Sequence, residues 1–363
     1  MSEEWKQRLK DYYEGNLSDK EAAEVEKELE KLDTYQEVIA DELKPPEDTT
    51  DELEPDKAGK IIKNSIRNAR FSLAAYVTMI ILLILPVMMM VSYLYYGWGQ
   101  KAEDLIQVAI QTVYVTEPNV SLEEMEIERT FGLFTFDVHM DLYKRVGKSD
   151  ISLGDWDVSY NFDQAEFPNR HYIIENPPQD IPLPDQKKLF HPEAEVTNRD
   201  LNAWDKLEKL PEGTVSELYV SLEGTYSPTE MRGVLEDVSA EWIWYAIDTG
   251  LEAEGKSSEG GFLPPIGYPA KPDPDGWSPY HSREMNEEQF MDSLRFLSKY
   301  ENQATNIAHA KWLDLEERIN HLETNGLKAY GGVVTGPTKE LLKLENHEAV
   351  RLIHIGEVRL WNW

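Results

Sequence analysis

Residues Phe71–Tyr96 read FSLAAYVTMIILLILPVMMMVSYLYY, 26 residues without a charged side chain. A helix rises about 1.5 Å per residue, so roughly 20 apolar residues are enough to cross the hydrocarbon core of a bilayer. Core helices of soluble proteins are rarely apolar on every face over such a length. The stretch therefore predicts a transmembrane helix. Pro86 removes one backbone donor inside it and predicts a kink, which membrane helices tolerate.

The charges on the two sides of this stretch differ. Five basic and no acidic side chains precede it, at Lys57, Lys60, Lys63, Arg67 and Arg70. On the other side, Lys101 stands next to Glu103 and Asp104. Positive charge is retained on the cytoplasmic side, which predicts an N-terminus inside and a C-terminal part outside. Aromatic residues typical of the outer membrane interface follow at Tyr93, Tyr95, Tyr96 and Trp98.

The chain is expected to keep this helix as an uncleaved, single-pass anchor in the cell membrane. A cleaved signal peptide has a shorter apolar region near the N-terminus, whereas here 70 mostly polar residues come first. The exported part, residues 97–363, has 267 residues, enough for one large domain or two modest ones. The chain has no cysteine, so thiol catalysis, Cys zinc sites and Fe–S clusters are excluded. An exported domain without disulfides is more typical of a bacterial membrane than of a small secreted scaffold.

The formal net charge of −32 is unevenly distributed. Residues 1–56 hold 7 basic and 20 acidic side chains, a net charge of −13, and residues 71–363 have a net charge of −24. Such acidity argues against direct binding of nucleic acid by either soluble part. Inside, it is compatible with a basic protein partner. For the outer part, solubility alone is the simpler interpretation.

Residues 1–44 have the pattern of two short helices. Trp5, Leu9, Tyr12 and Tyr13 have the spacing of one helix face, and Gly15 suits a left-handed C-cap. A capping box over residues 18–21 then opens a second helix. Its apolar stripe consists of Ala22, Val25, Leu29, Leu32 and Ile39, with Tyr35 and Val38 beside it. Pro45-Pro46 ends the helix, and residues 45–70 form an acidic tether followed by the basic juxtamembrane stretch.

Two helices of this size cannot bury both apolar stripes well by themselves. A self-packed helical hairpin is the simpler alternative, but the aromatic content favours a surface that binds a partner. The predicted partner-binding residues are Trp5, Leu9, Tyr12, Tyr13, Leu29, Leu32 and Tyr35.

The outer part alternates strand and helix patterns, which predicts an α+β fold, with α/β as the alternative. We divide it into a membrane-proximal part, residues 97–199, and a C-terminal domain, residues 200–363. Strands are predicted over residues 130–143, 156–162, 215–222, 242–247, 327–334 and 350–360. Helices are predicted over residues 102–114, 200–209, 286–325 and 338–344, with a further one opened by Ser227 and Pro228.

The sequence contains no recognisable catalytic motif, and we expect no catalytic residue, cofactor or metal site. The eight histidines are scattered, and each is interpreted as a solvated or core residue. Glycine-rich residues 330–337 favour a turn that requires glycine over an anion site at the following helix. Trp242 and Trp244, like Trp361 and Trp363, alternate as strand residues do, which favours core packing over a ligand platform. The loop around Pro264-Pro265 is open to two interpretations, a recognition loop or a surface crossing.

Two regions resemble known families. The pattern Trp5…Leu9…Tyr12-Tyr13-x-Gly15-x-Leu17-Ser18-x-x-Glu21…Glu28-Leu29 resembles the N-terminal segment of anti-sigma factors that bind extracytoplasmic-function sigma factors. In the zinc-binding branch of that group a His-x-x-x-Cys-x-x-Cys motif occurs here, but this chain has Glu28, Leu32 and Tyr35 at those positions. The resemblance therefore implies a zinc-free version.

The second resemblance covers roughly residues 200–363. Residues 216–222, 330–342 and 356–363 resemble the sigma-factor-regulator C-terminal domain of Bacillus-type membrane anti-sigma factors, including regulators of the sigma-M kind. It implies a non-enzymatic protein that holds a sigma factor at the membrane and releases it upon envelope stress, with or without a second small membrane protein. The alternatives are an anchored cell-envelope enzyme and a receptor subunit that signals through another membrane protein.

Overall fold

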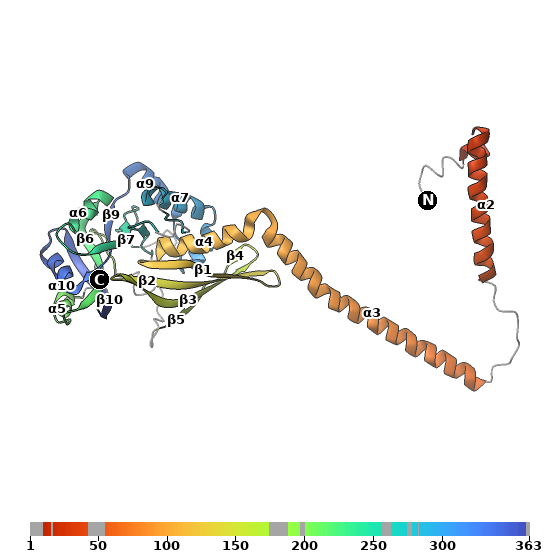
Figure 1. Ribbon diagram of the computed structural model, residues 1–363, viewed down its shortest axis with the longest axis horizontal. Helices are drawn as coiled ribbons and strands as arrows, with labels where there is room; N and C mark the ends of the chain where they lie inside the picture. Colours follow the sequence, from red (N-terminus) through yellow and green to blue (C-terminus); the bar gives the residue numbers. More distant parts are fainter. Residues whose placement is uncertain are drawn as a thin grey trace. The chain divides into compact units, whose positions relative to one another are not determined.

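The structure is a computed structural model that describes residues 10–15, 17–42, 55–173, 188–196, 200–255, 263–273, 278–281 and 283–360. It divides into two units, Met1–Met79 and Ile80–Trp363. The division falls inside one long helix, α3 (Pro55–Gly97) (Figure 1).

The first unit contains helix α2 (Asp19–Glu42), which begins where the sequence predicts. Gly15 has a φ of +72°, so the predicted left-handed turn before this helix is confirmed. The backbone amide of Ser18 donates to Glu21 Oε2 at 3.2 Å, and Ser18 Oγ donates to the same oxygen at 2.6 Å. The glutamate half of the predicted capping box is therefore present. The predicted stop at Pro45-Pro46 lies outside the described residues.

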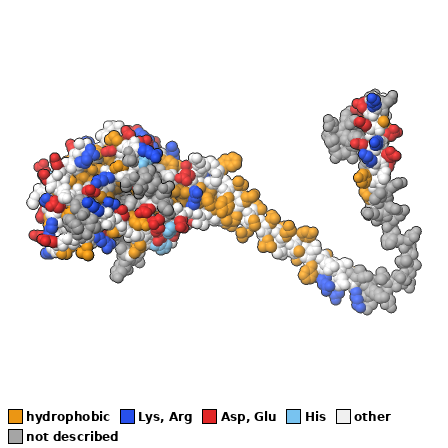
Figure 2. Space-filling view, in the orientation of Figure 1, with side chains coloured by type: hydrophobic (Ala, Val, Ile, Leu, Met, Phe, Trp, Pro, Cys, Tyr) orange, Lys and Arg blue, Asp and Glu red, His pale blue; other side chains and the backbone are white. Residues whose placement is uncertain are grey.

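Helix α3 has 43 residues and includes the whole apolar stretch. It continues without interruption through Pro86. Its most apolar window is not buried at all against the rest of the protein, and its length and composition are sufficient to cross a membrane. Figure 2 shows Lys and Arg side chains on the first part of α3 and hydrophobic side chains along the rest.

Helix α4 (Lys101–Thr116) follows α3 after a short 3₁₀ turn, η1 (Trp98–Gln100). Gly99 and Gln100 both have left-handed backbone angles, with φ values of 67° and 64°, which end one helix axis before the next begins. Leu105, Val108 and Val113 of α4 are buried, and the helix contacts β1 and β2 on one side and α7 and α8 on another (Figure 1). The chain therefore passes from the apolar helix directly into the core of the domain that follows, residues 101–360, which is called the outer domain after its predicted location.

Sheet A is antiparallel and follows α4. It contains β1 (Val120–Phe131), β2 (Thr135–Val146), β3 (Ser149–Asn161), β4 (Gln164–Ala165) and β5 (Asn169–Tyr172). The first four strands pair in chain order, and β5 pairs with β3. Alternate residues of β2 and β3 are buried, as the period of two predicts. The prediction of one strand over residues 130–143 is wrong, because a turn at Gly132–Phe134 separates β1 from β2.

Sheet B is also antiparallel, in the order β10-β6-β9-β7-β8. Its strands are β6 (Thr214–Tyr226), β7 (Glu241–Ile247), β8 (Gly267–Pro269), β9 (Ala329–Pro337) and β10 (Val350–Leu360). The glycine-rich residues form the central strand β9, so the predicted turn is wrong. A Cβ on Gly331 would lie 2.3 Å from the Val220 carbonyl oxygen, and one on Gly332 would lie 2.3 Å from that of Trp244. These glycines are needed because neighbouring backbones approach closely.

The helices of the outer domain lie where the sequence predicts them, and the long helical region over residues 286–325 is divided into three helices. They are α5 (Ala203–Glu208), α6 (Pro228–Val234), α7 (Asn286–Ser298), α8 (Glu301–Ile307), α9 (Leu315–Asn325) and α10 (Thr338–Leu341), which the 3₁₀ helix η3 (Leu342–Asn346) follows. All pairings between named strands are antiparallel, which settles the fold class as α+β. One hydrophobic core runs through residues on both sides of position 200.

Ser227 caps α6 as predicted, with Pro228 in the first turn and a complete capping box to Glu230. Replacing Ser227 by alanine is expected to lower the free energy of unfolding by about 1 kcal/mol, because the Glu230 amide loses its acceptor. Urea unfolding of the full-length protein followed by tryptophan fluorescence measures this loss. Ser239→Ala, at another exposed serine, is the matched control and should change stability by less than about 0.5 kcal/mol.

Candidate functional site

The predicted partner-binding face is partly exposed where the structure describes it. Tyr13 and Tyr35 are 76% and 68% exposed, and Tyr12 and Leu29 are half-buried. Trp5 and Leu9 lie outside the described residues, as does the side chain of Leu32. The structure thus shows four of the seven predicted side chains and leaves the rest of this face a prediction.

The apolar stripe of α2 changes character along the helix. Val25 near its start is buried, Leu29 is half-buried, and Tyr35 and Ile39 near its end are mostly exposed. Large apolar side chains rarely stand exposed together on a helix without a partner surface. Acidic side chains lie near them along α2, since Glu28, Glu30 and Asp33 are also exposed. This half of the helix combines apolar and negative surface.

The end of α3 is anchored in the outer domain by tyrosines. Tyr96 is completely buried, and its hydroxyl donates to the Phe134 carbonyl oxygen at 2.9 Å. The Phe134 amide in turn donates to Ser92 Oγ at 2.8 Å. The aromatic-belt prediction is therefore wrong for Tyr96, which packs against Phe136 in the domain core. Trp98 is 80% exposed, which is compatible with a position at the membrane interface.

A polar cluster next to Tyr96 joins the same two parts. Tyr95 donates to Asp163 Oδ1 at 2.7 Å, and Lys101 Nζ lies 2.5 Å from the same oxygen. Burial would raise the pKa of Asp163, but hydrogen bonds from Lys101 and Tyr95 outweigh it and lower that pKa. The turns at the ends of β1 and β3 thus hold the last turn of α3, so a movement of sheet A would be transmitted to this helix.

Two ion pairs are buried in the described part of the outer domain. Arg318 Nη1 lies 2.7 Å from Glu252 Oε1, and both side chains are almost completely buried. Lys144 Nζ lies 3.2 Å from Glu217 Oε2, which joins strand β2 of sheet A to strand β6 of sheet B. Asn119 also donates to Glu217, at 2.7 Å. Groups engaged in this way stabilise the packing of the two sheets and are not available as free acids or bases.

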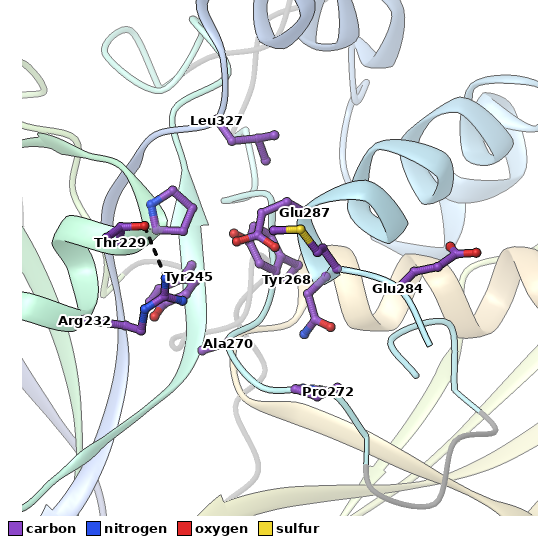
Figure 3. A pocket seen from close by; sticks show the side chains of 12 residues that line it. Thr229, Arg232, Tyr245, Tyr268, Ala270, Pro272, Glu284, Glu287 and Leu327 are labelled. Carbon is purple, nitrogen blue, oxygen red and sulfur yellow. Dashed lines mark hydrogen bonds between the residues drawn. The ribbon is translucent and has the colours of Figure 1, made fainter. Parts of the chain in front are cut away.

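A cavity of about 490 Å³ lies between α6, strands β7 and β8, and the start of α7 (Figure 3). Its polar lining includes Arg232, which donates to Thr229 Oγ1 at 3.2 Å, together with Glu284 and Glu287. Tyr245 and Tyr268 form an aromatic wall. The cavity therefore combines one guanidinium group, two carboxylates and an aromatic wall.

The tryptophan prediction is confirmed for the two that are described. Trp242 and Trp244 are buried in the core, where their indole N–H groups donate to the carbonyl oxygens of Met231 and Tyr114. Trp361 and Trp363 lie outside the described residues. The loop around Pro264-Pro265 is described only from residue 263, where Leu263 and Ile266 are buried.

The histidine prediction missed one cluster. His139 on β2 and His171 on β5 approach Asp155 and Asp157, which lie between them on β3. A hydrogen bond to Asp157 raises the pKa of His139 despite partial burial. The sequence contains a signal for this cluster, because His139 and Asp141, like Asp155 and Asp157, are two positions apart. Residues two positions apart lie on the same face of a strand. Only the pairing of the strands places the two faces side by side.

Two family models of known proteins match parts of this chain. The family model described as "Sigma factor regulator C-terminal" matches residues 207–357, and "Sigma factor regulator N-terminal" matches residues 59–151. The N-terminal match covers α3, α4, β1 and β2, and it does not include residues 1–44, on which the N-terminal resemblance rested. No solved structure matches this chain.

A curated relative covers the whole chain, including residues 1–58. It is the probable anti-sigma-M factor YhdL of Bacillus subtilis (strain 168), 32% identical over 367 aligned residues that include 100% of both chains. Identity at this level over the full length shows common family membership. Together with the two family models and the single candidate membrane helix among the described residues, it identifies a membrane protein. The chain belongs to the family of anti-sigma factors that carry sigma factor regulator N-terminal and C-terminal domains.

Proposed function

We propose that this protein holds an extracytoplasmic-function sigma factor at the cell membrane and releases it when the outer domain detects envelope stress. The observation that carries this proposal is the order of the parts. An acidic helical segment with exposed apolar residues, one membrane helix and a large folded domain follow one another in the chain. The relative with the same full-length match is named an anti-sigma-M factor. A sigma factor of that class is thus the partner we expect.

The orientation in this proposal places residues 1–70 in the cytoplasm and residues 97–363 outside. Lys60, Lys63, Arg67 and Arg70 are exposed at the start of α3 and carry the positive charge that stays inside. A single crossing places the acidic segment where RNA polymerase and its sigma factors are. It also places sheets A and B outside the membrane, where the stress signal arises.

The contact face that we propose for the sigma factor consists of Trp5, Leu9, Tyr12, Tyr13, Leu29, Leu32 and Tyr35. Support comes from the exposure of Tyr13 and Tyr35 and from the apolar surface that continues to Ile39. Aromatic side chains contribute much of the binding energy at protein interfaces. The acidic residues around them favour a partner with a basic rim.

Release of the partner would pass through the junction between α3 and sheet A. Tyr95, Tyr96 and Lys101 bind the turns of that sheet, so a change in the outer domain reaches the membrane helix without a flexible linker. Conformational change, proteolysis and a second small membrane protein are three routes that this arrangement permits. We propose no catalytic role, since the family is regulatory.

Replacing Leu29 by aspartate is expected to weaken sigma-factor binding by about 100-fold, or about 2.7 kcal/mol, because a charge is placed inside an apolar contact. The measurement is capture of the host's small sigma factors by full-length protein in detergent, followed by titration of the factor captured. Trp5→Asp should have an effect at least as large.

Leu201→Asp is the matched control, since Leu201 is 78% exposed on the outer domain. It should bind the sigma factor as the parent does. Undiminished binding by both Leu29→Asp and Trp5→Asp would show that the contact face is elsewhere. Failure of the parent itself to capture any sigma factor would favour a receptor subunit or an anchored envelope enzyme.

A further inference from the structure

The outward face of sheet A carries the cluster of histidines and aspartates introduced above. In the strand register, His139 of β2 lies opposite Asp157 of β3, and Asp155 of β3 lies opposite His171 of β5. The four side chains therefore form two neighbouring cross-strand pairs on one face of three adjacent strands. Figure 2 shows histidine and acidic side chains side by side on the visible face of the outer domain.

The distances bring His139, Asp155 and Asp157 into one cluster, with His171 beside the two aspartates. His139 Nδ1 lies 2.7 Å from Asp157 Oδ1, and His171 Nδ1 lies 2.8 Å from Asp155 Oδ2. The diagonal distances are similar to each other, 4.0 Å from His139 to Asp155 and 3.9 Å from His171 to Asp157. One ligand atom each of His139, Asp155 and Asp157 lies within 4.8 Å of the others. Ligands of a tetrahedral zinc ion, at about 2.1 Å from the metal, are separated by about 3.4 Å, so the three side chains would move closer together and His171 would rotate toward them to bind one ion.

The charge of the cluster is not balanced by lysine or arginine. In the part of the chain that the structure describes, the recorded ion pairs of Asp141, Asp155 and Asp157 are all with His139 or His171. Neutral histidines would leave three carboxylates without a positive partner. The remaining ring nitrogen of His139, Nε2, lies 4.0 Å from Asp141. A bound cation would remove this excess of negative charge.

The access and the rigidity of the cluster also suit a metal ion. The four side chains are 28% to 56% exposed, so water and ions reach them from solvent. Buried residues of the same strands, such as Met140 and Trp156, fix the backbone beneath them. Ligands on paired strands are positioned more firmly than ligands on loops.

We propose that His139, His171, Asp155 and Asp157 form an external binding site for a divalent transition-metal ion of the zinc class. Two imidazoles and two carboxylates are the nitrogen and oxygen ligands that tetrahedral Zn²⁺ accepts. Ca²⁺ and Mg²⁺ prefer sites made entirely of oxygen, which this one is not. The ion would join β2, β3 and β5 and thereby stabilise the edge strand β5.

Binding of Zn²⁺ and Co²⁺ to the full-length protein in detergent tests the site. We expect one equivalent of Zn²⁺ per chain in competition with a chromophoric chelator, and a Co²⁺ absorption spectrum with the intensity of a four-coordinate ion. His139→Ala and His171→Ala should each weaken Zn²⁺ binding by more than 10-fold and abolish that Co²⁺ spectrum. Loss of a mere outer-shell partner already costs 10- to 100-fold in metal affinity.

Two further variants keep the test decisive. Asp155→Asn preserves the shape of the side chain and should also weaken Zn²⁺ binding, even if an alanine variant were to disturb the sheet. His347→Ala, at a half-buried histidine after η3, is the matched control and should bind as the parent does. The proposal is overturned if the parent binds no Zn²⁺, or if a folded His139→Ala/His171→Ala double variant binds it as tightly as the parent.

Discussion

Replacing Arg318 by methionine is expected to lower the free energy of unfolding of the outer domain by about 3–5 kcal/mol. Arg318 is fully buried and donates to Glu252 Oε1 at 2.7 Å, to Thr249 Oγ1 at 2.9 Å and, through Nε, to the Leu313 carbonyl oxygen at 2.8 Å. Its loss leaves the Glu252 carboxylate buried without a charged partner. Urea unfolding of the full-length protein, followed by tryptophan fluorescence, measures the change.

A double variant separates the charge effect from loss of packing. Arg318→Met combined with Glu252→Gln removes both charges, so it should be more stable than Arg318→Met alone. Arg295→Met serves as the control, because Arg295 pairs with Asp292 and Glu323 at the surface, where ion pairs contribute little. A loss below about 1 kcal/mol for Arg318→Met would mean that water or another group compensates Glu252.

Replacing Tyr96 by alanine is expected to destabilise the outer domain by about 3–5 kcal/mol, the usual cost of removing a large buried aromatic side chain. The ring is completely buried, and its centroid lies 5.4 Å from that of Phe136 and 5.0 Å from that of Tyr95. The variant also frees the last turn of α3 from the β1–β2 turn. Thermal or urea unfolding of the full-length protein in detergent measures the stability.

Tyr96→Phe distinguishes the ring from the hydroxyl group. It removes the hydroxyl's hydrogen bonds to the carbonyl oxygens of Phe134, at 2.9 Å, and Tyr160, at 3.4 Å, and should cost about 1–2 kcal/mol. Tyr93→Ala is the matched control, because Tyr93 is 53% exposed at the same end of α3. If Tyr96→Ala unfolds like the parent, the tyrosine is not an anchor of the membrane helix. Amide hydrogen exchange should be faster around residues 92–96 in Tyr96→Ala than in Tyr93→Ala.

Local patterns in the sequence were sufficient for the elements whose cause is local. The length of the stretch without charged residues predicts α3. Helix ends are predicted by Gly15 and by the capping residues Ser18 and Ser227. The alternation of apolar and polar residues predicts most strands. These features depend on residues a few positions apart, so no distant contact is needed to predict them. The division between solvent-facing and buried positions on β2 follows for the same reason.

Patterns failed where a distant segment decides the conformation. Apolar residues continue through Gly132–Phe134, where Leu133 and Phe134 are adjacent, so their density hides the point at which the chain turns. Gly331 and Gly332 resemble turn residues in the sequence. The central strand needs glycine at these positions because the backbones of Val220 and Trp244 lie beside them, which only the structure shows. Tyr96 has the position of an interface residue in sequence, but sheet A encloses it.

The sequence by itself determined the order of the parts, the membrane helix, the acidic helical segment and the resemblance that family comparison later confirmed for the whole chain. Only the tertiary structure decided that both sheets are antiparallel, that Arg318 and Glu252 are buried together, and that His139 and His171 meet across β3. The physical reason is the range of the interactions involved. Helix length, capping and hydropathy depend on neighbouring residues. The Arg318–Glu252 pair joins residues 66 positions apart, and the pairing of β6 with β9 joins segments that are still more distant in the sequence.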